Sequence, residues 1–335
     1  MDRKQQVCLG EDTSSLLPIH SGIPQGNVIG PLLFNIYLND ITKACLQQYG
    51  TQGIKLYADD AKIYGTDAND LQISINQTLS FLQNRQLGVA QEKCFSMTIS
   101  KPRANNDSHD FRINGVVIEN KPYTKDLGIY ITENLKWSHH INFITKKASV
   151  SAYQILKSFR TKEVGILIHL FKTYVRPKLE HNSEIWSPHL LKDIEKLEDV
   201  QKSYTRNIFK RCGISYLSYS DRLQQANLQS LERRRLQKDL VYLYKIFYGY
   251  SDINFDDDFI LKHSRYNLRR HNAQIKIKNP LNLQTNQYLN SFFIRVVKVW
   301  NDLPDEIVQS RSISIFKHKL NSFSFSNFLQ FKLQS

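Results

Sequence analysis

Two adjacent carboxylates, Asp59 and Asp60, stand in the middle of LYADDAKIYG, residues 56–65. Apolar and aromatic residues flank the pair, and Gly53 and Gly65 bound the segment, which predicts an antiparallel hairpin with both aspartates at its turn. Paired hard oxygen ligands suit Mg²⁺, which takes few protein carboxylates and completes its octahedron with water and substrate phosphates. An exposed acidic turn is the alternative, since turns favour aspartate in any case.

The residues around the pair favour the cation site. Upstream, Gly22 and Gly26 flank Pro and Gln in SGIPQG (21–26), which predicts a bent loop that approaches a ligand with its backbone. Downstream, Lys93 is a cation that could meet a triphosphate. Gly128 stands within DLGIYI (126–131), where a glycine in a strand marks a bulge or a close approach.

The order of these pieces resembles the palm of a reverse transcriptase. SGIPQGNVIGPLLFNIYLNDI, YADD, Lys93 and DLGI are most similar to the LINE-type, non-LTR retrotransposon class, jockey-like elements and their relatives. YVRPKLEHNSEIWSP (174–188) and RVVKVWNDLPDEIVQSRSISIFKHKL (295–320) resemble the thumb and tail of such elements. The resemblance implies an RNA-directed DNA polymerase, a nucleotidyltransferase that uses two Mg²⁺ ions, or Mn²⁺ in their place. Its partners would be an RNA template, a DNA primer and deoxynucleoside triphosphates.

The same resemblance implies roles for individual residues. Asp59 and Asp60 would be catalytic metal ligands. Tyr57 and Ala58 would face the primer and the incoming nucleotide, and Lys93 would lie near the leaving pyrophosphate as a candidate general acid. The loop that positions nucleotide and template would comprise Ser21, Gly22, Pro24, Gln25 and Gly26.

The family's palm also has a strand that grips the primer terminus and, on an earlier strand, a further catalytic aspartate. DLGIYI would be the gripping strand, but no stretch within residues 1–20 resembles the earlier one. Glu11 and Asp12 are interpreted as loop residues, because such acids favour turns. Arg85 stands where relatives often carry a tryptophan-bearing segment. We therefore expect an N-terminally truncated reverse transcriptase whose activity is impaired.

Charge and composition point to the same class of partner. The 335 residues carry a formal charge of +14 and 41% are hydrophobic, which favours a folded protein with an anionic partner, most commonly a nucleic acid. One acid-free basic segment interleaves Tyr266 with Lys262, Arg265, Arg269, Arg270, Lys276 and Lys278. That segment is either a surface that tracks phosphates or a solvated loop.

The remaining composition excludes other classes. No cysteine lies at metal-ligand spacing from another, so we expect reduced thiols in an intracellular, nuclear or cytoplasmic protein. The cysteines are Cys8, Cys45, Cys94 and Cys212. No apolar run reaches the roughly 18 residues of a spanning helix, so no membrane segment is expected. The sequence leaves the oligomeric state unknown.

The elements that must position these residues predict an α+β fold. Residues 1–136 would form a partial polymerase palm, which is an antiparallel sheet with helices. A mostly helical thumb-like region would follow at 137–215, and a basic C-terminal region of retrotransposon type at 216–335. Apolar spacing predicts palm helices at 30–44 and 67–86, and strands at 93–100 and 124–132. Asn114–Gly115 predicts a hairpin turn, and helical periodicity dominates from Trp137 to Arg211.

Two further hypotheses stay open beside the polymerase. One is a catalytically inactive nucleic-acid-binding fragment that holds primer–template duplexes by phosphate contacts. The other is an element relic with no retained role.

Overall fold

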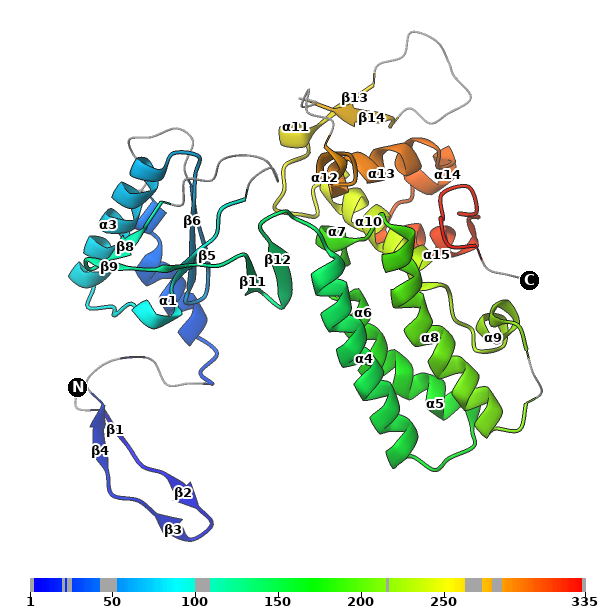
Figure 1. The fold of residues 1–335 in the computed structure, drawn as a ribbon, viewed down its shortest axis with the longest axis horizontal. Helices are drawn as coiled ribbons and strands as arrows, with labels where there is room; N and C mark the ends of the chain where they lie inside the picture. The colour runs from blue at the N-terminus through cyan, green and yellow to red at the C-terminus, as the bar shows by residue number, and fades with distance from the viewer. Residues whose placement is uncertain are drawn as a thin grey trace. The chain divides into compact units, whose positions relative to one another are not determined.

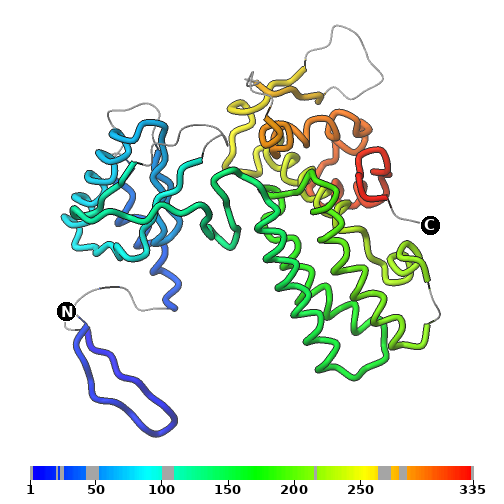
Figure 2. The backbone as a smooth tube through the Cα atoms, in the orientation of Figure 1, coloured from blue at the N-terminus to red at the C-terminus, as the bar shows by residue number. Residues whose placement is uncertain are grey.

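The computed structural model describes residues 3–19, 22, 26–42, 53–99, 109–214, 217–262, 273–278 and 285–332. The chain divides into two compact units, the first formed by residues 1–98 and 105–121 and the second by 99–104 and 122–335. Figure 1 draws the elements of each unit, and Figure 2 follows the backbone from its blue N-terminus to its red C-terminus. Two-stranded sheets with helices make up the first unit and helices dominate the second, so the described part of the chain has the expected α+β character.

A long, exposed hairpin opens the first unit. Strand β1 (Arg3–Gln5) pairs with β4 (Leu17–Ile19), and β2 (Cys8–Leu9) pairs with β3 (Asp12–Thr13), all antiparallel. Glu11 lies in the turn, as expected. Asp12 is instead a strand residue opposite Leu9, because the tight turn at Gly10 returns the chain at once. The prediction that Asp12 is a loop residue is therefore wrong.

Two helices and the hairpin of β5 (Gly53–Tyr57) and β6 (Asp60–Tyr64) enclose a small core. Helix α1 (Gly30–Leu38) has a proline in its first turn, as predicted, but ends short of residue 44. Helix α3 (Ala68–Asn84) begins after Asp67, whose carboxylate accepts a hydrogen bond from the Asp70 N–H at 2.9 Å. The core consists of Ile41, which follows α1, with Ile54, Leu56 and Ile63 of the hairpin and Phe81 and Leu82 of α3.

The other strands of the first unit are very short. Strand β7 (Phe95–Ser96) pairs in parallel with β10 (Glu119–Asn120), and a 3₁₀ helix at Gln91–Lys93 occupies the start of the predicted 93–100 strand. Strands β8 (Arg112–Ile113) and β9 (Val116–Val117) form the hairpin predicted from Asn114–Gly115. Both turn residues have positive φ, 50° and 81°, which confirms the Asn–Gly prediction.

The predicted strand at 124–132 is wrong, because the chain turns back in its middle. Strands β11 (Tyr123–Asp126) and β12 (Ile129–Thr132) pair antiparallel around Leu127 and Gly128, whose φ angles are 44° and 88°. A distant residue supports this turn: a ring nitrogen of His181 lies 3.2 Å from the Leu127 carbonyl oxygen. A Cβ at Gly128 would lie 3.3 Å from the same ring, so glycine serves both the left-handed backbone and the close approach.

Helices come after Trp137, as the periodicity predicts. They are α4 (Ser138–Ser158), α5 (Val164–Leu170), a π-helical turn (Phe171–Val175), α6 (Arg176–Glu180), α7 (Ser183–Trp186) and α8 (Leu191–Arg211). Next come α9 (Tyr219–Gln225), α10 (Leu231–Phe247), α11 (Phe255–Asp258), β13 (Phe259–Leu261) and β14 (Ile275–Ile277). The chain then forms α12 (Asn286–Leu289), α13 (Phe292–Asn301), α14 (Asp305–Val308) and α15 (Ile313–Ser322). Most of the basic segment at 262–278 lies outside the described residues.

Two hydrophobic cores stabilise the second unit, and α10 takes part in both. The first core lies among α4, α5 and α8 and includes Trp186 and Leu231, the first residue of α10. The second lies among α10, α13 and α15 and includes Leu240 and Trp300. Helix α10 therefore joins the two cores within a single element.

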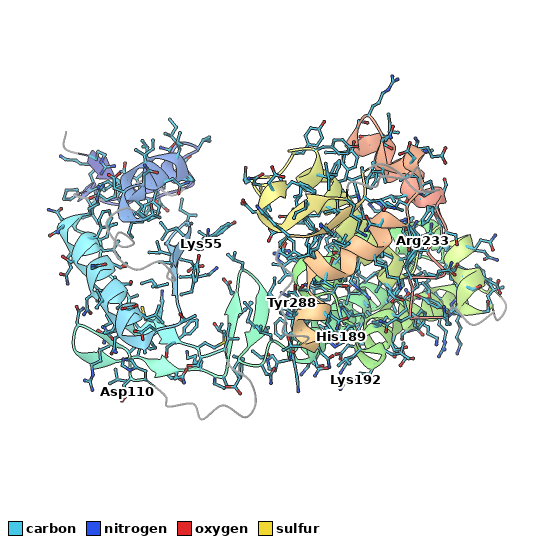
Figure 3. The ribbon with its side chains drawn as sticks, turned by 90° about the horizontal axis from the view of Figure 1, so that it is seen from above. Lys55, Asp110, His189, Lys192, Arg233 and Tyr288 are labelled. Atoms are coloured by element: carbon cyan, nitrogen blue, oxygen red, sulfur yellow. The ribbon has the colours of Figure 1, made fainter. Side chains whose placement is uncertain are left out.

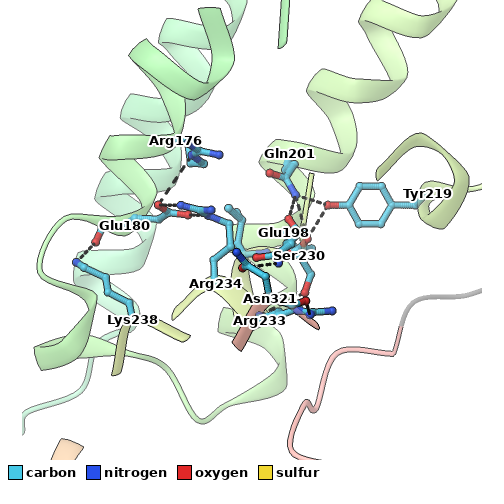
Figure 4. A network of polar contacts seen from close by, with 12 residues as sticks. Arg176, Glu180, Glu198, Gln201, Tyr219, Ser230, Arg233, Arg234, Lys238 and Asn321 are labelled. Atoms are coloured by element: carbon cyan, nitrogen blue, oxygen red, sulfur yellow. Dashed lines mark hydrogen bonds and ion pairs between the residues drawn. The ribbon is translucent and has the colours of Figure 1, made fainter. Parts of the chain in front are cut away.

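A buried carboxylate fixes the N-terminus of α10 (Figure 4). Glu198 of α8 is fully buried, accepts a hydrogen bond from the Leu231 N–H at 2.8 Å and another from the Tyr219 hydroxyl at 2.6 Å. Burial raises the pKa of Glu198, while the Tyr219 hydrogen bond and the positive charge of Arg235 lower it. The single side chain thus links α8, α9 and α10.

Membrane segments and thiols are the remaining features for which the composition gave an expectation. Within the described residues, no helix combines the length and the apolar character needed to cross a bilayer. Cys8, Cys94 and Cys212 are free thiols, as predicted, and Cys45 lies outside the described residues. Burial raises the pKa of the Cys94 thiol.

Replacing Glu198 by Gln should destabilise the second unit by about 2–3 kcal/mol, because it leaves the buried Arg235 guanidinium short of counter-charge. All three tryptophans, Trp137, Trp186 and Trp300, lie in this unit, so urea unfolding followed by tryptophan fluorescence measures the effect. Glu195→Gln, an exposed position on the same helix, is the matched control. Equal unfolding midpoints for the two variants would contradict the assigned role.

Acid should weaken the same unit through His140. This buried side chain accepts a hydrogen bond from the Tyr130 N–H at 3.2 Å, and burial, then the charges of His181 and His139, lowers its pKa to about 4. In the unfolded chain this histidine is protonated below about pH 6.5, whereas in the folded chain it stays neutral down to about pH 4. The free energy of unfolding is therefore highest above pH 6.5 and decreases as the pH falls toward 4. The loss between pH 7 and pH 5 should be about 2 kcal/mol.

The test compares urea unfolding at both pH values in the wild type, His140→Asn and His318→Asn. The asparagine oxygen can still accept the Tyr130 N–H but does not titrate, so His140→Asn should show a smaller pH dependence. His318 is exposed on α15 and its variant should behave like the wild type. The same pH dependence in all three proteins would exclude His140 as its cause.

Candidate catalytic hairpin

The β5–β6 pair confirms the antiparallel hairpin predicted from LYADDAKIYG, although the prediction that both aspartates lie in its turn holds for only one of them. Gly53 pairs with Tyr64 at the open end, and Tyr57 pairs with Asp60 next to the turn. Ala58 and Asp59 form the turn itself, so one aspartate lies in the turn and the other begins β6. The chain thereby presents two neighbouring carboxylates at the end of a two-stranded ribbon.

Alternation along the strands separates an inner from an outer face. Ile54 and Leu56 of β5 belong to the small core. Lys55, labelled in Figure 3, lies on the outer face and pairs directly with Lys62. The outer face therefore carries two basic side chains beside Tyr57 and Asp60.

The turn carries backbone strain. Ala58 has φ of 50°, a left-handed conformation that costs an L-residue with a Cβ about 1 kcal/mol. Strained non-glycine residues gather at sites where the surrounding structure imposes a geometry for function. The alanine between Tyr57 and Asp59 is such a residue, which adds to the case that this turn is a functional site.

The two carboxylates have the donor chemistry of a Mg²⁺ site but do not complete one. Both are exposed, and no hydrogen bond or ion pair joins either side chain to another described residue. Exposed oxygens fit a hard cation whose other ligands are water and substrate phosphates. No cluster of three or more His, Cys, Asp or Glu that could hold a metal occurs among the described residues. The described residues therefore bring two neighbouring carboxylates together without a larger group of potential ligands around them.

The other predicted site residues lie in three places. Lys93 is the exposed last residue of the 3₁₀ helix in the first unit. Gly22 and Gly26 both have φ of 85°, in keeping with the bent loop expected there. Ser21, Pro24 and Gln25 lie outside the described residues, so the prediction that their loop positions nucleotide and template stays a prediction. DLGIYI is the β11–β12 hairpin of the second unit, not a single strand.

Arg85 has a structural role that the sequence did not reveal. At the C-terminal end of α3 it donates to the Tyr37 carbonyl at 2.5 Å and pairs with Asp40 at 3.2 Å. Its guanidinium also lies 4.7 Å from the Phe81 ring centre and 5.1 Å from that of Tyr37. These contacts hold α1, the helix after the glycine-rich loop, against α3. The spacing of Phe81 and Arg85 on one helix face was the available signal.

A second surface of interest lies in the helical unit, between α4 and α8. A groove of about 550 Å³ opens there, and Tyr153, 64% exposed, stands on one wall. Its polar and charged lining consists of Asn142, Thr145, Lys146, Ser149, Lys196, Asp199, Ser203 and Asn207, with two cations and one carboxylate. Such a set of hydrogen-bond donors and cations suits a sugar–phosphate backbone.

Comparisons with known proteins give the family. A family model described as reverse transcriptase (RNA-dependent DNA polymerase) matches residues 6–144. The uncharacterized protein B0403.1 of Caenorhabditis elegans is 33% identical over 149 residues, 44% of this chain and 73% of that protein. The RNA-directed DNA polymerase from mobile element jockey of Drosophila melanogaster is 24% identical over 219 residues, 62% of this chain. The polyprotein from type-1 retrotransposable element R2 of Popillia japonica is 25% identical over 225 residues, also 62% of this chain.

The region matched by the reverse transcriptase family model contains the hairpin with its paired aspartates. The chain belongs to the reverse transcriptases of LINE-type, non-LTR retrotransposons. It spans 24% of the length of the jockey polymerase and 36% of the R2 polyprotein. No solved structure matches the chain closely enough to show a relationship.

Relief of strain at the turn gives a test of the hairpin. Ala58→Gly should stabilise the β5–β6 pairing slightly, whereas Ala58→Val should weaken it by about 1–2 kcal/mol relative to glycine, because a β-branched residue tolerates positive φ poorly. Hydrogen exchange of the strand amides in Gly53–Tyr57 and Asp60–Tyr64 measures the change. Faster exchange in the glycine variant than in the valine variant would show that Ala58 does not adopt this conformation.

Proposed function

We propose that the chain carries part of a nucleotidyl-transfer site, in which Asp59 and Asp60 bind a divalent cation for RNA-directed DNA synthesis. The observation that carries the proposal is the β5–β6 turn: two neighbouring, exposed carboxylates at the end of a hairpin within the matched family region. Mg²⁺ or Mn²⁺, when bound, would neutralise triphosphate charge and activate a primer 3′-hydroxyl.

The outer face of the hairpin has the chemistry to position the substrates. Tyr57 lies opposite Asp60 and is 64% exposed, so its ring is available to the primer terminus or the incoming nucleotide. Lys55, exposed on the same face, would attract a phosphate of the same strand. Lys93 would face the leaving pyrophosphate, and the loop with Ser21, Gly22, Pro24, Gln25 and Gly26 would hold nucleotide and template.

The proposed organisation is the family's plan of palm, thumb and tail, at residues 1–136, 137–215 and 216–335. The groove between α4 and α8 would accept the backbone of a primer–template duplex, since it combines Lys146 and Lys196 with short polar side chains. The β11–β12 hairpin would contact the primer end. A formal charge of +14 supports nucleic-acid partners for the whole chain.

One observation favours a second candidate, a nucleic-acid-binding protein with little activity of its own. The described residues bring no third carboxylate to Asp59 and Asp60. Most of the catalytic power in phosphoryl transfer comes from positioning and charge neutralisation, so a site that lacks a metal ligand should be slow. We therefore propose that this chain alone binds primer–template and extends it poorly.

Primer extension tests both parts of the proposal. The 335-residue chain should bind a labelled RNA–DNA primer–template yet extend it at least about 10²-fold more slowly than a chimera that adds the segments preceding the matched region in the jockey polymerase. In the chimera, Asp59→Asn should abolish extension without weakening binding. Asp110→Asn, an exposed position of the first unit labelled in Figure 3, is the matched control. Full extension by Asp59→Asn would refute the assigned role of the pair.

A further inference from the structure

A groove in the second unit is lined by none of the residues that were assigned a role above. It has a volume of about 370 Å³ and runs between α10 and α15. Its lining consists of Glu184, Arg234, Gln237, Lys238, Val241, Tyr242, Lys245, Lys317, Leu320 and Asn321. Four of these side chains are cations and one is a carboxylate, so the groove has a positive lining.

The cations differ in how far they are already neutralised. Arg234 forms a two-pronged pair with Glu180, and Lys238 pairs with Glu184 at 2.8 Å (Figure 4 shows the Arg234–Glu180 pair). Within the described part of the chain, no ion pair neutralises Lys245 of α10 or Lys317 of α15. These two lysines leave the groove with net positive charge even after both glutamates are counted.

The floor of the groove is apolar and contains an aromatic ring. Val241, Tyr242 and Leu320 supply it. The Tyr242 ring is half-buried and held against Phe292, with 5.4 Å between ring centres and a 59° tilt. An aromatic surface of this kind can stack a nucleobase at little entropic cost, because its orientation is already set.

We propose that the α10–α15 groove binds single-stranded nucleic acid, with a base on Tyr242 and the phosphates along Arg234, Lys238, Lys245 and Lys317. Arg234 and Lys245 are eleven residues apart on α10, about 16 Å at the helical rise, so the cations track a strand over several nucleotides. An aromatic floor between cationic walls matches a strand whose bases turn inward. A duplex stacks its bases inside and offers only its backbone to such a surface, which leaves the floor without a ligand.

The proposal is independent of polymerase activity, since neither aspartate of the hairpin takes part in it. The result of a binding measurement on the full chain therefore does not depend on the result of primer extension. The probe is a fluorescein-labelled single-stranded oligouridylate, with fluorescence anisotropy as the readout.

The Lys245→Glu, Lys317→Glu double variant should bind the probe at least about tenfold more weakly than the wild type at ~0.1 M salt. Loss of two phosphate contacts should also reduce the slope of log affinity against log salt by about 1.4. The control is the Lys192→Glu, Lys298→Glu double variant, which makes the same charge change at two exposed lysines outside the groove. Lys192 is labelled in Figure 3.

Two measurements need no charge reversal. Lysine acetylation of the wild-type chain should be slower at Lys245 and Lys317 when the oligouridylate is bound, and unchanged at Lys192. Tyr242→Leu should weaken binding, whereas Tyr242→Phe, which keeps the ring, should not. Protection of the two groove lysines together with the tyrosine pattern supports the proposal.

Three results would overturn it. The first is an equal loss of affinity in the groove variant and the control variant. The second is duplex RNA that competes as well as the single strand for the groove lysines, which would assign the groove to duplex backbone. The third is protection by an acidic peptide but not by the oligonucleotide, which would assign it to a protein partner.

Discussion

The second unit depends on one buried carboxylate at the start of one helix. An α-helix leaves its first N–H groups unpaired, and α10 begins inside a core, where water cannot satisfy them. The Ser230 side chain accepts one of these bonds and Glu198 accepts another from Leu231. Because α10 then continues into the second core, the position of its first turn determines where Leu240 and Tyr244 pack. Ion pairs from the same helix to α6, α7 and α13 reinforce that position.

The candidate catalytic hairpin depends on a different kind of constraint. Its turn rests on local backbone geometry, and only the inner face, with Ile54 and Leu56, packs into a core. The outer face with Tyr57 and Asp60 is exposed. Because successive side chains of a strand point to opposite faces, the core-forming side chains and the exposed polar ones lie on opposite faces of the same hairpin.

Sequence patterns predicted the elements whose conformation depends on residues close together in the chain. The β5–β6 and β8–β9 hairpins were predictable from alternating apolar residues and turn-formers within a few positions of each other. DLGIYI failed because Leu127 carries no turn signal; its positive φ depends in part on His181, which is 54 residues away. Glu198 and Arg85 were missed for the same reason, since their partners lie on other elements. The position of the aspartate pair at the end of a hairpin was predictable because the apolar alternation and the turn-formers lie in adjacent residues.

The π-helical turn at Phe171–Val175 also sets the angular position of the helix after it. An α-helix advances 100° per residue, so one extra residue in a turn rotates the rest of the helix by about that angle. Helix α6 continues directly from this turn and carries Glu180, whose carboxylate meets the Arg234 guanidinium of α10. Without the added residue, the carboxylate would point roughly a quarter of a turn away from its partner. The π-helical turn therefore sets the rotation of α6 about its axis so that Glu180 faces Arg234 of α10.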